Sequence, residues 1–371
     1  MFDLVQFTQQ NVSILLCLLI YCNTLRERHK LTRSSLLSPA FSPWKQLLNH
    51  GDDSSFLDLT AFCRRAFSNL VNLCKVHYRD YQTGRHLSLD LQDQVGLYLF
   101  YVCSRMGLKH LCMIFGIVPS TASSYLSNIM TIIIKALKRH RLAAIKFPCE
   151  GVMRELAAMT ESREPRVKNV IGFVDGVAIP IQCSDDAIDQ NANYNGHLKD
   201  TVCNNVLAFG TNGKIIHASI NYPGSWHDST VAQKFMELVI RLIGEYALCV
   251  DQGFPRSGLM RDRFVGPISK KRRAALAATV RDIVLAQHAV YVSLRQAAEW
   301  GMRALQGTFS RLKSRLTSNK VKRRDIIYSI LLLHNFRTCT VGLNQIKSVF
   351  EPHYVQYMNL NPYDRIARYF A

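Results

Sequence analysis

Four acidic residues stand where a protein scaffold could present them for chemistry: Asp175, Asp228, Asp251 and Glu299. Each aspartate lies where an apolar, strand-like run meets a glycine-containing turn, and loops at strand ends often carry reactive groups. Glu299 lies in LRQAAEWGMRALQGTFSRLK, where apolar residues recur at helical spacing. Taken singly, each aspartate is also explained as a turn residue or a helix N-cap.

The chemical type of this acidic set indicates the metal that it would bind. Clustered carboxylates without a paired Cys/His set suit hard, oxygen-liking cations, Mg²⁺ or Mn²⁺, rather than zinc. Two such ions held close together would activate a water or a 3′-hydroxyl and stabilise the leaving oxygen of a phosphodiester. The four acids are therefore candidate metal ligands for chemistry on a nucleic-acid backbone.

The chain is long, basic and globular in composition. Its 371 residues suffice for two domains, and 48% of them are hydrophobic. Lys and Arg outnumber Asp and Glu by 46 to 27, which gives a net charge of +19. This excess predicts a polyanionic partner, with nucleic acid first and an anionic membrane second. A solvated basic surface is the alternative.

The 11 cysteines form no CxxC pair and show no zinc or disulfide spacing. Cys103, Cys203 and Cys249 lie in apolar runs and are interpreted as small core residues of a protein from a reducing compartment. The run Ser13–Cys22 (SILLCLLIYC) is shorter than the roughly 20 residues of a membrane-spanning helix. It is interpreted as a buried or docking helix, and neither a secretory signal nor a membrane partner is expected.

Patterning divides the chain into four segments. Residues 1–55 are interpreted as an N-terminal helix and a Ser/Pro-rich linker, and residues 56–150 as a helical domain. Strand-like patterning begins near residue 168, which predicts a second domain over 168–340 and a C-terminal tail over 341–371. The predicted fold class is α+β, with the helical region preceding a mixed sheet.

Residues 87–142 carry a second motif, because they predict two helices, a short turn and a further helix. Gly116 closes one helix, and Ser120 or Thr121 after Pro119 opens the next. This is a helix-turn-helix-like arrangement, whose second helix can lie in a DNA major groove. The side chains expected to face bases or phosphates are Ser120, Thr121, Ser123, Ser124 and Asn128. A helical hairpin that never touches DNA is an equal alternative.

The order of elements after residue 168 is informative. Val170–Val174 predicts a strand ending at Asp175, and Thr201–Phe209 with Lys214–Asn221 predicts a hairpin around an Asn-Gly turn. A helix over 231–243 and a fourth strand over 246–250, ending at Asp251, follow. This order describes a ribonuclease-H-like core. The first and fourth strands are neighbours in such a core, so Asp175 and Asp251 are expected to approach one another.

Basic residues accompany the acids. The run Lys270–Arg273 is equally interpreted as a nuclear-import signal, a DNA-backbone patch or a solvated face. Four cations after Glu299 are suited to phosphates: Arg303, Arg311, Lys313 and Arg315. His334, in a C-terminal amphipathic helix, is expected to be a core or capping residue rather than a ligand.

The chain resembles Harbinger-type transposases of the DDE superfamily. The motifs that carry the resemblance, in the family's order over about residues 170–337, are GFVDGVAIPI, NYNGHLKD, GSWHDS, VDQGFP, AEWGMRALQGTFSRLK and LLLHNF. The helix-turn-helix-like region also resembles the family's N-terminal part. The sequence departs from the commoner family wording at Gln252, Phe254 and Trp300, and none of these departures removes an acid.

The resemblance implies a ribonuclease-H-like endonuclease that cuts and joins DNA with a divalent metal. Asp175 would be the first catalytic aspartate and Glu299 the catalytic glutamate. Element order favours Asp251 as the middle acid, whereas the family also gives weight to Asp228 in HDS. Lys199 and His227 would orient phosphates, although His227 is equally explained as a turn-stabilising imidazole.

The resemblance also implies partners and a location. We expect DNA as the substrate, a separate Myb-like DNA-binding helper protein and a homo-oligomer, in the nucleus with the cytoplasm as a second location. The chief rival from another class is a domesticated derivative that binds DNA or protein without cleaving. A related nuclease unconnected with transposition is a second rival.

Overall fold

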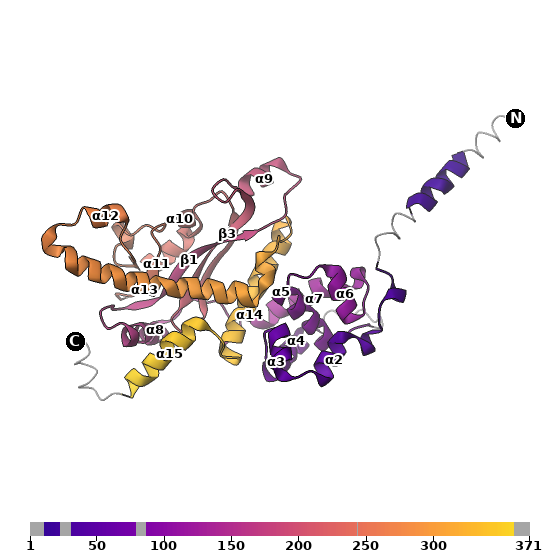
Figure 1. Cartoon of the computed structure of the whole chain (residues 1–371), viewed down its shortest axis with the longest axis horizontal. Helices are drawn as coiled ribbons and strands as arrows, with labels where there is room; N and C mark the ends of the chain where they lie inside the picture. The colour runs from indigo at the N-terminus through magenta and orange to yellow at the C-terminus, as the bar shows by residue number, and fades with distance from the viewer. Residues whose placement is uncertain (1–10, 23–30, 79–86, 243, 360–371) are drawn as a thin grey trace.

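The computed structural model describes residues 11–22, 31–78, 87–242 and 244–359. A group of helices lies at one end of the molecule, and a sheet flanked by longer helices forms the other (Figure 1). The helical group contains α2 (Pro43–His50), α3 (Asp53–Thr60), α4 (Arg64–Tyr78), α5 (Leu91–Cys103), α6 (Leu108–Phe115) and α7 (Pro119–Leu137). The α+β class predicted from the sequence is confirmed.

The helical group begins earlier than the sequence suggested. Ser42 caps α2 by accepting from the Lys45 amide, and Trp44 in its first turn is fully buried. The indole ring stacks on Phe115 at a centroid distance of 5.2 Å, and its Nε1 donates to Asp93 Oδ1 at 2.8 Å. The linker assigned to this stretch is therefore wrong from Arg33 onward, where short 3₁₀ turns lead into α2. Its part over 23–30 lies outside the described residues.

Helices α6 and α7 form the predicted helix, turn and helix. Gly116 ends α6 with a φ of +67°, a left-handed conformation that glycine adopts without strain. The two helix axes differ in direction by 93°. Helix α7 starts at Pro119 with Val118 as its N-cap, so Ser120 and Thr121 lie in the first turn rather than at the cap. Ser120, Ser123 and Ser124 are exposed, and DNA contact by this face stays a prediction.

The sheet has the strand order of a ribonuclease-H-like core. Strands run in the order β4 (Ile215–Pro223), β3 (Asp200–Gly210), β1 (Val170–Pro180), β5 (Ala247–Val250) and β6 (Phe264–Val265). The short β2 (Tyr194–Asn195) pairs with the start of β3. The pairs β1–β3 and β3–β4 are antiparallel, whereas β1–β5 and β5–β6 are parallel. The predicted adjacency of the first strand and the 247–250 strand is confirmed.

The first strand is longer than predicted. It does not end at Asp175 but continues to Pro180, because β3 pairs with it along this length, from Gly172↔Gly210 to Pro180↔Val202. The predicted hairpin of β3 and β4 is confirmed, with Gly213 at a φ of +79° in its turn. Asn335 fixes the outer strand of that hairpin, since its Oδ1 accepts from the Ile215 amide at 2.7 Å and its Nδ2 donates to the Ile215 carbonyl at 2.9 Å.

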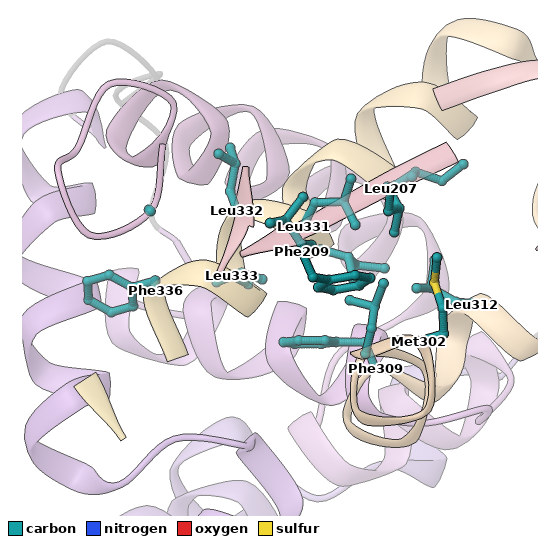
Figure 2. Packing of buried hydrophobic residues seen from close by; sticks show 14 of the residues in the cluster. Leu207, Phe209, Met302, Phe309, Leu312, Leu331, Leu332, Leu333 and Phe336 are labelled. Atoms are coloured by element: carbon teal, nitrogen blue, oxygen red, sulfur yellow. The ribbon is translucent and has the colours of Figure 1, made fainter. Parts of the chain in front are cut away.

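Helices flank the sheet and join it to the helical group. They are α8 (Glu150–Arg163), α9 (Ala187–Asn193), α10 (Asp228–Val231), α11 (Gln233–Ile240), α12 (Lys270–Ala274), α13 (Ala278–Thr308), α14 (Lys320–Thr340) and α15 (Gln345–Met358). The long α13 runs lengthwise along the sheet (Figure 1). Figure 2 shows Leu207 and Phe209 of β3 in the core beside Leu331, Leu332, Met302, Phe309 and Leu312.

The helical group and the sheet share one hydrophobic core, because α14 packs against both α7 and β4. The Tyr98 hydroxyl in α5 hydrogen-bonds the Ser329 hydroxyl in α14. Arg311 donates to the carbonyls of Tyr101 and Met106 at 2.8 and 2.7 Å, and its guanidinium lies over the Tyr101 ring. These contacts hold the two parts together as one unit.

The apolar helix near the N-terminus spans Asn11–Cys22; of the two interpretations of this run, the buried helix is wrong and the docking helix stays a prediction. Its large apolar side chains, from Val12 to Tyr21, are 53% to 61% exposed. This helix is too short to be a candidate membrane span; among the described single helices, Lys320–Gln356 has the length and composition of one, but 61% of its apolar window is buried inside the protein. That stretch includes α14, which serves as a core helix.

His334 is the core residue that the sequence predicted. It is 3% exposed, its Nε2 lies 3.3 Å from the Gly213 carbonyl oxygen, and burial lowers its pKa to about 4. In the unfolded chain the pKa returns to the ordinary value of about 6.5. The unfolded state therefore takes up the proton first, and this contribution to stability is lost as the pH falls from 6.5 to about 4.

We therefore expect the free energy of unfolding to fall by up to about 3 kcal/mol over this range because of His334. Urea unfolding at pH 7, 6, 5 and 4 measures this dependence. His334→Gln keeps an amide donor for Gly213 and removes the titration, so its pH slope should be smaller than that of the wild type. Equal slopes in the two proteins would contradict the assignment.

Candidate active site

The two strand-borne aspartates lie side by side. Val174 of β1 is paired in parallel register with Val250 of β5, so the next residues, Asp175 and Asp251, leave this pairing at the same level. Strand β5 ends there, whereas β1 continues along β3. Asp175 is half-buried, and its Oδ1 accepts from the Gly176 amide at 2.9 Å. The register brings together two acids that are distant in sequence.

The pKa of Asp175 depends on the other acids around it. Burial, opposed by the Gly176 amide and the Arg295 guanidinium and helped by the negative charges of Asp251 and Asp228, raises its pKa to about 6. Below that pKa the carboxyl is protonated, so a cation must compete with a proton. Such crowding of like charges is typical of a site that gains from a bound cation.

Asp228 reaches the same place from a different element. It is the first residue of α10, and a Cβ atom added to Gly176 would lie 2.4 Å from its Cγ and Oδ2 atoms. The carboxylate thus occupies the space left by the missing side chain at position 176. Burial raises the pKa of Asp228, the His227 charge lowers it, and the negative charge of Asp251 raises it. Three carboxylates therefore share one neighbourhood.

Glu299 is held by an arginine that sequence reasoning missed. Arg295 lies one turn earlier on α13, its Nη2 forms an ion pair with Glu299 Oε1, and its Nη1 lies 3.7 Å from Asp251 Oδ1. Its positive charge also acts on Asp175. Helical spacing of an arginine four residues before the glutamate was the available signal. Arg295 links the glutamate to the aspartates.

The donor set fits Mg²⁺ or Mn²⁺ in chemical type, since all four members are carboxylates and two have pKa values raised by burial and by neighbouring negative charge. Asp251 and Glu299 are part-exposed, with side-chain exposures of 45% and 41%. Within the described ranges, no three His, Cys, Asp or Glu side chains lie close enough to hold a metal ion. Arg295 must move for Glu299 to join the aspartates as a ligand.

A pocket of about 670 Å³ adjoins Asp228 and Gly176. Its wall includes the exposed rings of Tyr194 and Trp226, together with His197 and His227. The amide of Asn204 donates to the carbonyl of Trp226 at 2.7 Å and so holds the loop that carries the tryptophan. Lys199 is exposed just beyond the pocket, with a φ of +53°. The pocket offers aromatic faces beside the acids.

The cations predicted to bind phosphates divide into two groups. Arg303 and Lys313 are exposed and available to a ligand. Arg311 instead donates hydrogen bonds to the carbonyls of Tyr101 and Met106, and burial lowers its pKa. Its observed role is therefore structural. Arg315 likewise pairs with Asp200 at 2.8 Å.

A mixed sheet with acids at the same level of two adjacent strands is typical of a nuclease-like domain. Residues 174–335 match the family model described as DDE superfamily endonuclease. The match runs from the residue before Asp175 to Asn335, so it includes all four acids. This part of the chain is a DDE superfamily endonuclease domain. Comparisons with curated proteins and with solved structures gave no significant match.

Proposed function

We propose that this protein is a metal-dependent DNA endonuclease and transposase of Harbinger type, which cleaves and joins phosphodiesters by a two-metal mechanism. The observation that carries the proposal is the β1–β5 register, which sets Asp175 beside Asp251, together with the endonuclease family match. The motifs GSWHDS and VDQGFP support the Harbinger type. The proposal is tested by metal-dependent nicking of plasmid DNA by the purified chain.

In this proposal, Asp175, Asp251 and Glu299 are the catalytic acids, and Asp228 supplies a fourth oxygen donor. A bound pair of Mg²⁺ or Mn²⁺ ions would supply an activated water or 3′-hydroxyl and neutralise charge on the leaving oxygen. Asp251 takes the middle position because its backbone is in register with Asp175. The half-buried setting of Asp175 excludes water and strengthens its interaction with charge.

Gly176→Ala tests the place given to Asp228. The added Cβ would lie 2.4 Å from the carboxylate and push it away, so we expect Mn²⁺ affinity and nicking to fall about 10–100-fold. Titration with Mn²⁺ and a nicking time course measure the two effects. Gly151→Ala on α8 is the matched control, because nothing lies within 4 Å of its added Cβ. Unchanged metal affinity in Gly176→Ala would exclude Asp228 from the ligand set.

The remaining predictions about DNA belong to the same proposal. The exposed serines of α7, Ser120 and Ser124, with Thr121 beside them, would contact one part of the DNA. Lys199, Arg303 and Lys313 would hold phosphates nearer the acids. A Myb-like helper, assembly into a homo-oligomer and a nuclear location, with the cytoplasm second, complete the proposed Harbinger type.

One observation favours the rival function of a non-cleaving DNA-binding derivative: Arg295 pairs with both Asp251 and Glu299. Arg295→Gln decides between the two. For an active enzyme we expect the wild type to bind Mn²⁺ and the variant to bind it about fivefold more tightly, since a part-exposed ion pair is worth roughly 1 kcal/mol. Binding by the variant alone, with no nicking by the wild type, would establish the derivative.

A further inference from the structure

A second pocket of about 660 Å³ adjoins strand β6 and the segment that follows β5. Three arginines line it: Arg256, Arg261 and Arg272. The hydroxyl-bearing residues Ser257 and Ser269 line it too, and no carboxylate does. A pocket with this lining is suited to an anion with several oxygens.

The positive charge in this pocket is only partly compensated, because Asp251 acts on Arg256 from outside the pocket lining. Within the ranges that the structure describes, none of the three arginines forms an ion pair. Burial lowers the pKa of Arg256, the charges of Cys249 and Asp251 raise it, and the nearby Arg272 charge lowers it again by repulsion. Next to Arg272, the Nε of Arg273 is buried without a hydrogen-bond partner in the described structure. An anion bound among the three arginines would relieve the repulsion between Arg256 and Arg272.

The backbone makes room for Arg256. Cys249 pairs with Val265 in parallel register, so Gly266 follows β6 at the level where β5 ends. A Cβ at Gly266 would lie 2.3 Å from the Val250 carbonyl oxygen and 3.2 Å from Arg256 Nη1. Glycine therefore lets the guanidinium lie against the strand end that carries Asp251, whose charge acts on Arg256. The arginine pocket thus lies beside the strand end that precedes Asp251.

We propose that this arginine pocket binds consecutive backbone phosphates of the DNA strand whose scissile bond lies at the acid cluster. This inference rests on the proposed nuclease function and specifies where the DNA strand runs after it leaves the acid cluster. Guanidinium groups bind phosphate oxygens in pairs, and a strand leaving the acids past Arg256 meets Arg261 and Arg272 next. Of the three interpretations of the run Lys270–Arg273, this one selects the DNA-backbone patch.

The test measures how DNA affinity depends on salt, with cleavage prevented by EDTA. Fluorescence anisotropy gives the Kd of the full chain for a labelled duplex between 50 and 300 mM KCl. Each phosphate contact contributes about 0.9 to the slope of log Kd against log salt. The triple variant R256Q/R261Q/R272Q is therefore expected to lose about 2 to 3 from the slope. An unchanged slope would overturn the proposal.

A matched control variant separates the effect of where the arginines lie from the effect of lowering the net charge of the protein. Arg65, Arg139 and Arg154 are exposed arginines on other elements, and R65Q/R139Q/R154Q removes the same charge. This control should keep the wild-type slope, and an equal loss in both triples would overturn the site. Because Arg256 is half-buried, the R261Q/R272Q double variant is measured as well, and thermal unfolding shows that each variant is folded. The double variant should lose about 2 from the slope.

Two further measurements complete the test. The first distinguishes DNA phosphates from a free polyphosphate as the ligand, and the second separates failure of this proposal from failure of the proposed nuclease function. Calorimetric titration with tripolyphosphate asks whether a free polyanion is the ligand. Micromolar binding that the triple variant loses, combined with an unchanged DNA slope, would overturn the DNA assignment. Asp175→Asn should retain the wild-type slope of log Kd against log salt. DNA binding by the arginine pocket can therefore be established even when no nicking is detected, and nicking can be established even when the slope is unchanged in the arginine variants.

Discussion

Asp175→Asn is expected to abolish metal-dependent nicking while leaving the fold intact. The substitution keeps the size of the side chain and an oxygen that can accept from the Gly176 amide, but it removes the charge that faces Asp251 and Asp228. Loss of one anionic ligand from a two-ion site should lower the rate by about 10³-fold or more, equivalent to about 4 kcal/mol of transition-state stabilisation. Glu299→Gln should have a similar effect.

Plasmid nicking with Mg²⁺ or Mn²⁺ measures the rate, and EDTA should abolish it in the wild type. Asp185→Asn is the control, because Asp185 is an exposed aspartate outside the acid cluster. Removing the excess of negative charge should also make Asp175→Asn slightly more stable, which thermal unfolding without metal can detect. Equal nicking by the wild type, Asp175→Asn and Glu299→Gln would remove the catalytic assignment.

Trp44→Ala is expected to cause the largest loss of stability of any substitution considered for this chain. The indole ring is fully buried, stacks on Phe115 and meets Phe100 edge-on at 5.7 Å. Emptying this site should cost about 3–5 kcal/mol. The loss should lie at the upper end, because Asp93 would lose the indole donor and keep Lys45, 2.7 Å away, as its ion-pair partner.

Urea unfolding followed by circular dichroism measures this loss. Phe41→Ala, three residues earlier, is the control: Phe41 is 81% exposed, so its truncation should change stability by no more than about 0.5 kcal/mol. Gly96→Ala should also destabilise the protein, because its Cβ would lie 2.2 Å from the Trp44 ring. A small loss in Trp44→Ala would show that the segment around α2 does not belong to the folded core.

Local signals predicted much of the fold. The Asn-Gly turn predicted the β3–β4 hairpin, and Gly116 with Pro119 predicted the break between α6 and α7, because these residues fix backbone conformation. The extension of β1 to Pro180 was missed because it comes from pairing with a distant strand. The role of Trp44 was missed for the same reason: its partners, Asp93 and Phe115, come from α5 and α6.

The adjacency of two of the candidate acids was predictable from the sequence. Strand order alone placed Asp175 beside Asp251, and parallel pairing produced that result. Local sequence pointed to Asp228 as a candidate but not to its place in the space beside Gly176, and nothing local pointed to Arg256, whose position depends on Gly266. The helical spacing from Glu299 was the local signal for Arg295, whereas only tertiary contacts assign Arg311 to backbone carbonyls.

The shared core around α14 has a consequence for any DNA gripped by α7. Tyr98 and Ser329 tie α5 to α14, and Arg337 of α14 donates to the Ala61 carbonyl at 2.9 Å, so no free hinge separates the described helical group from the catalytic sheet. A duplex seated on α7 would meet the carboxylates at a set offset along its axis. The protein would then fix the distance along the DNA between the bound site and the cleavage site.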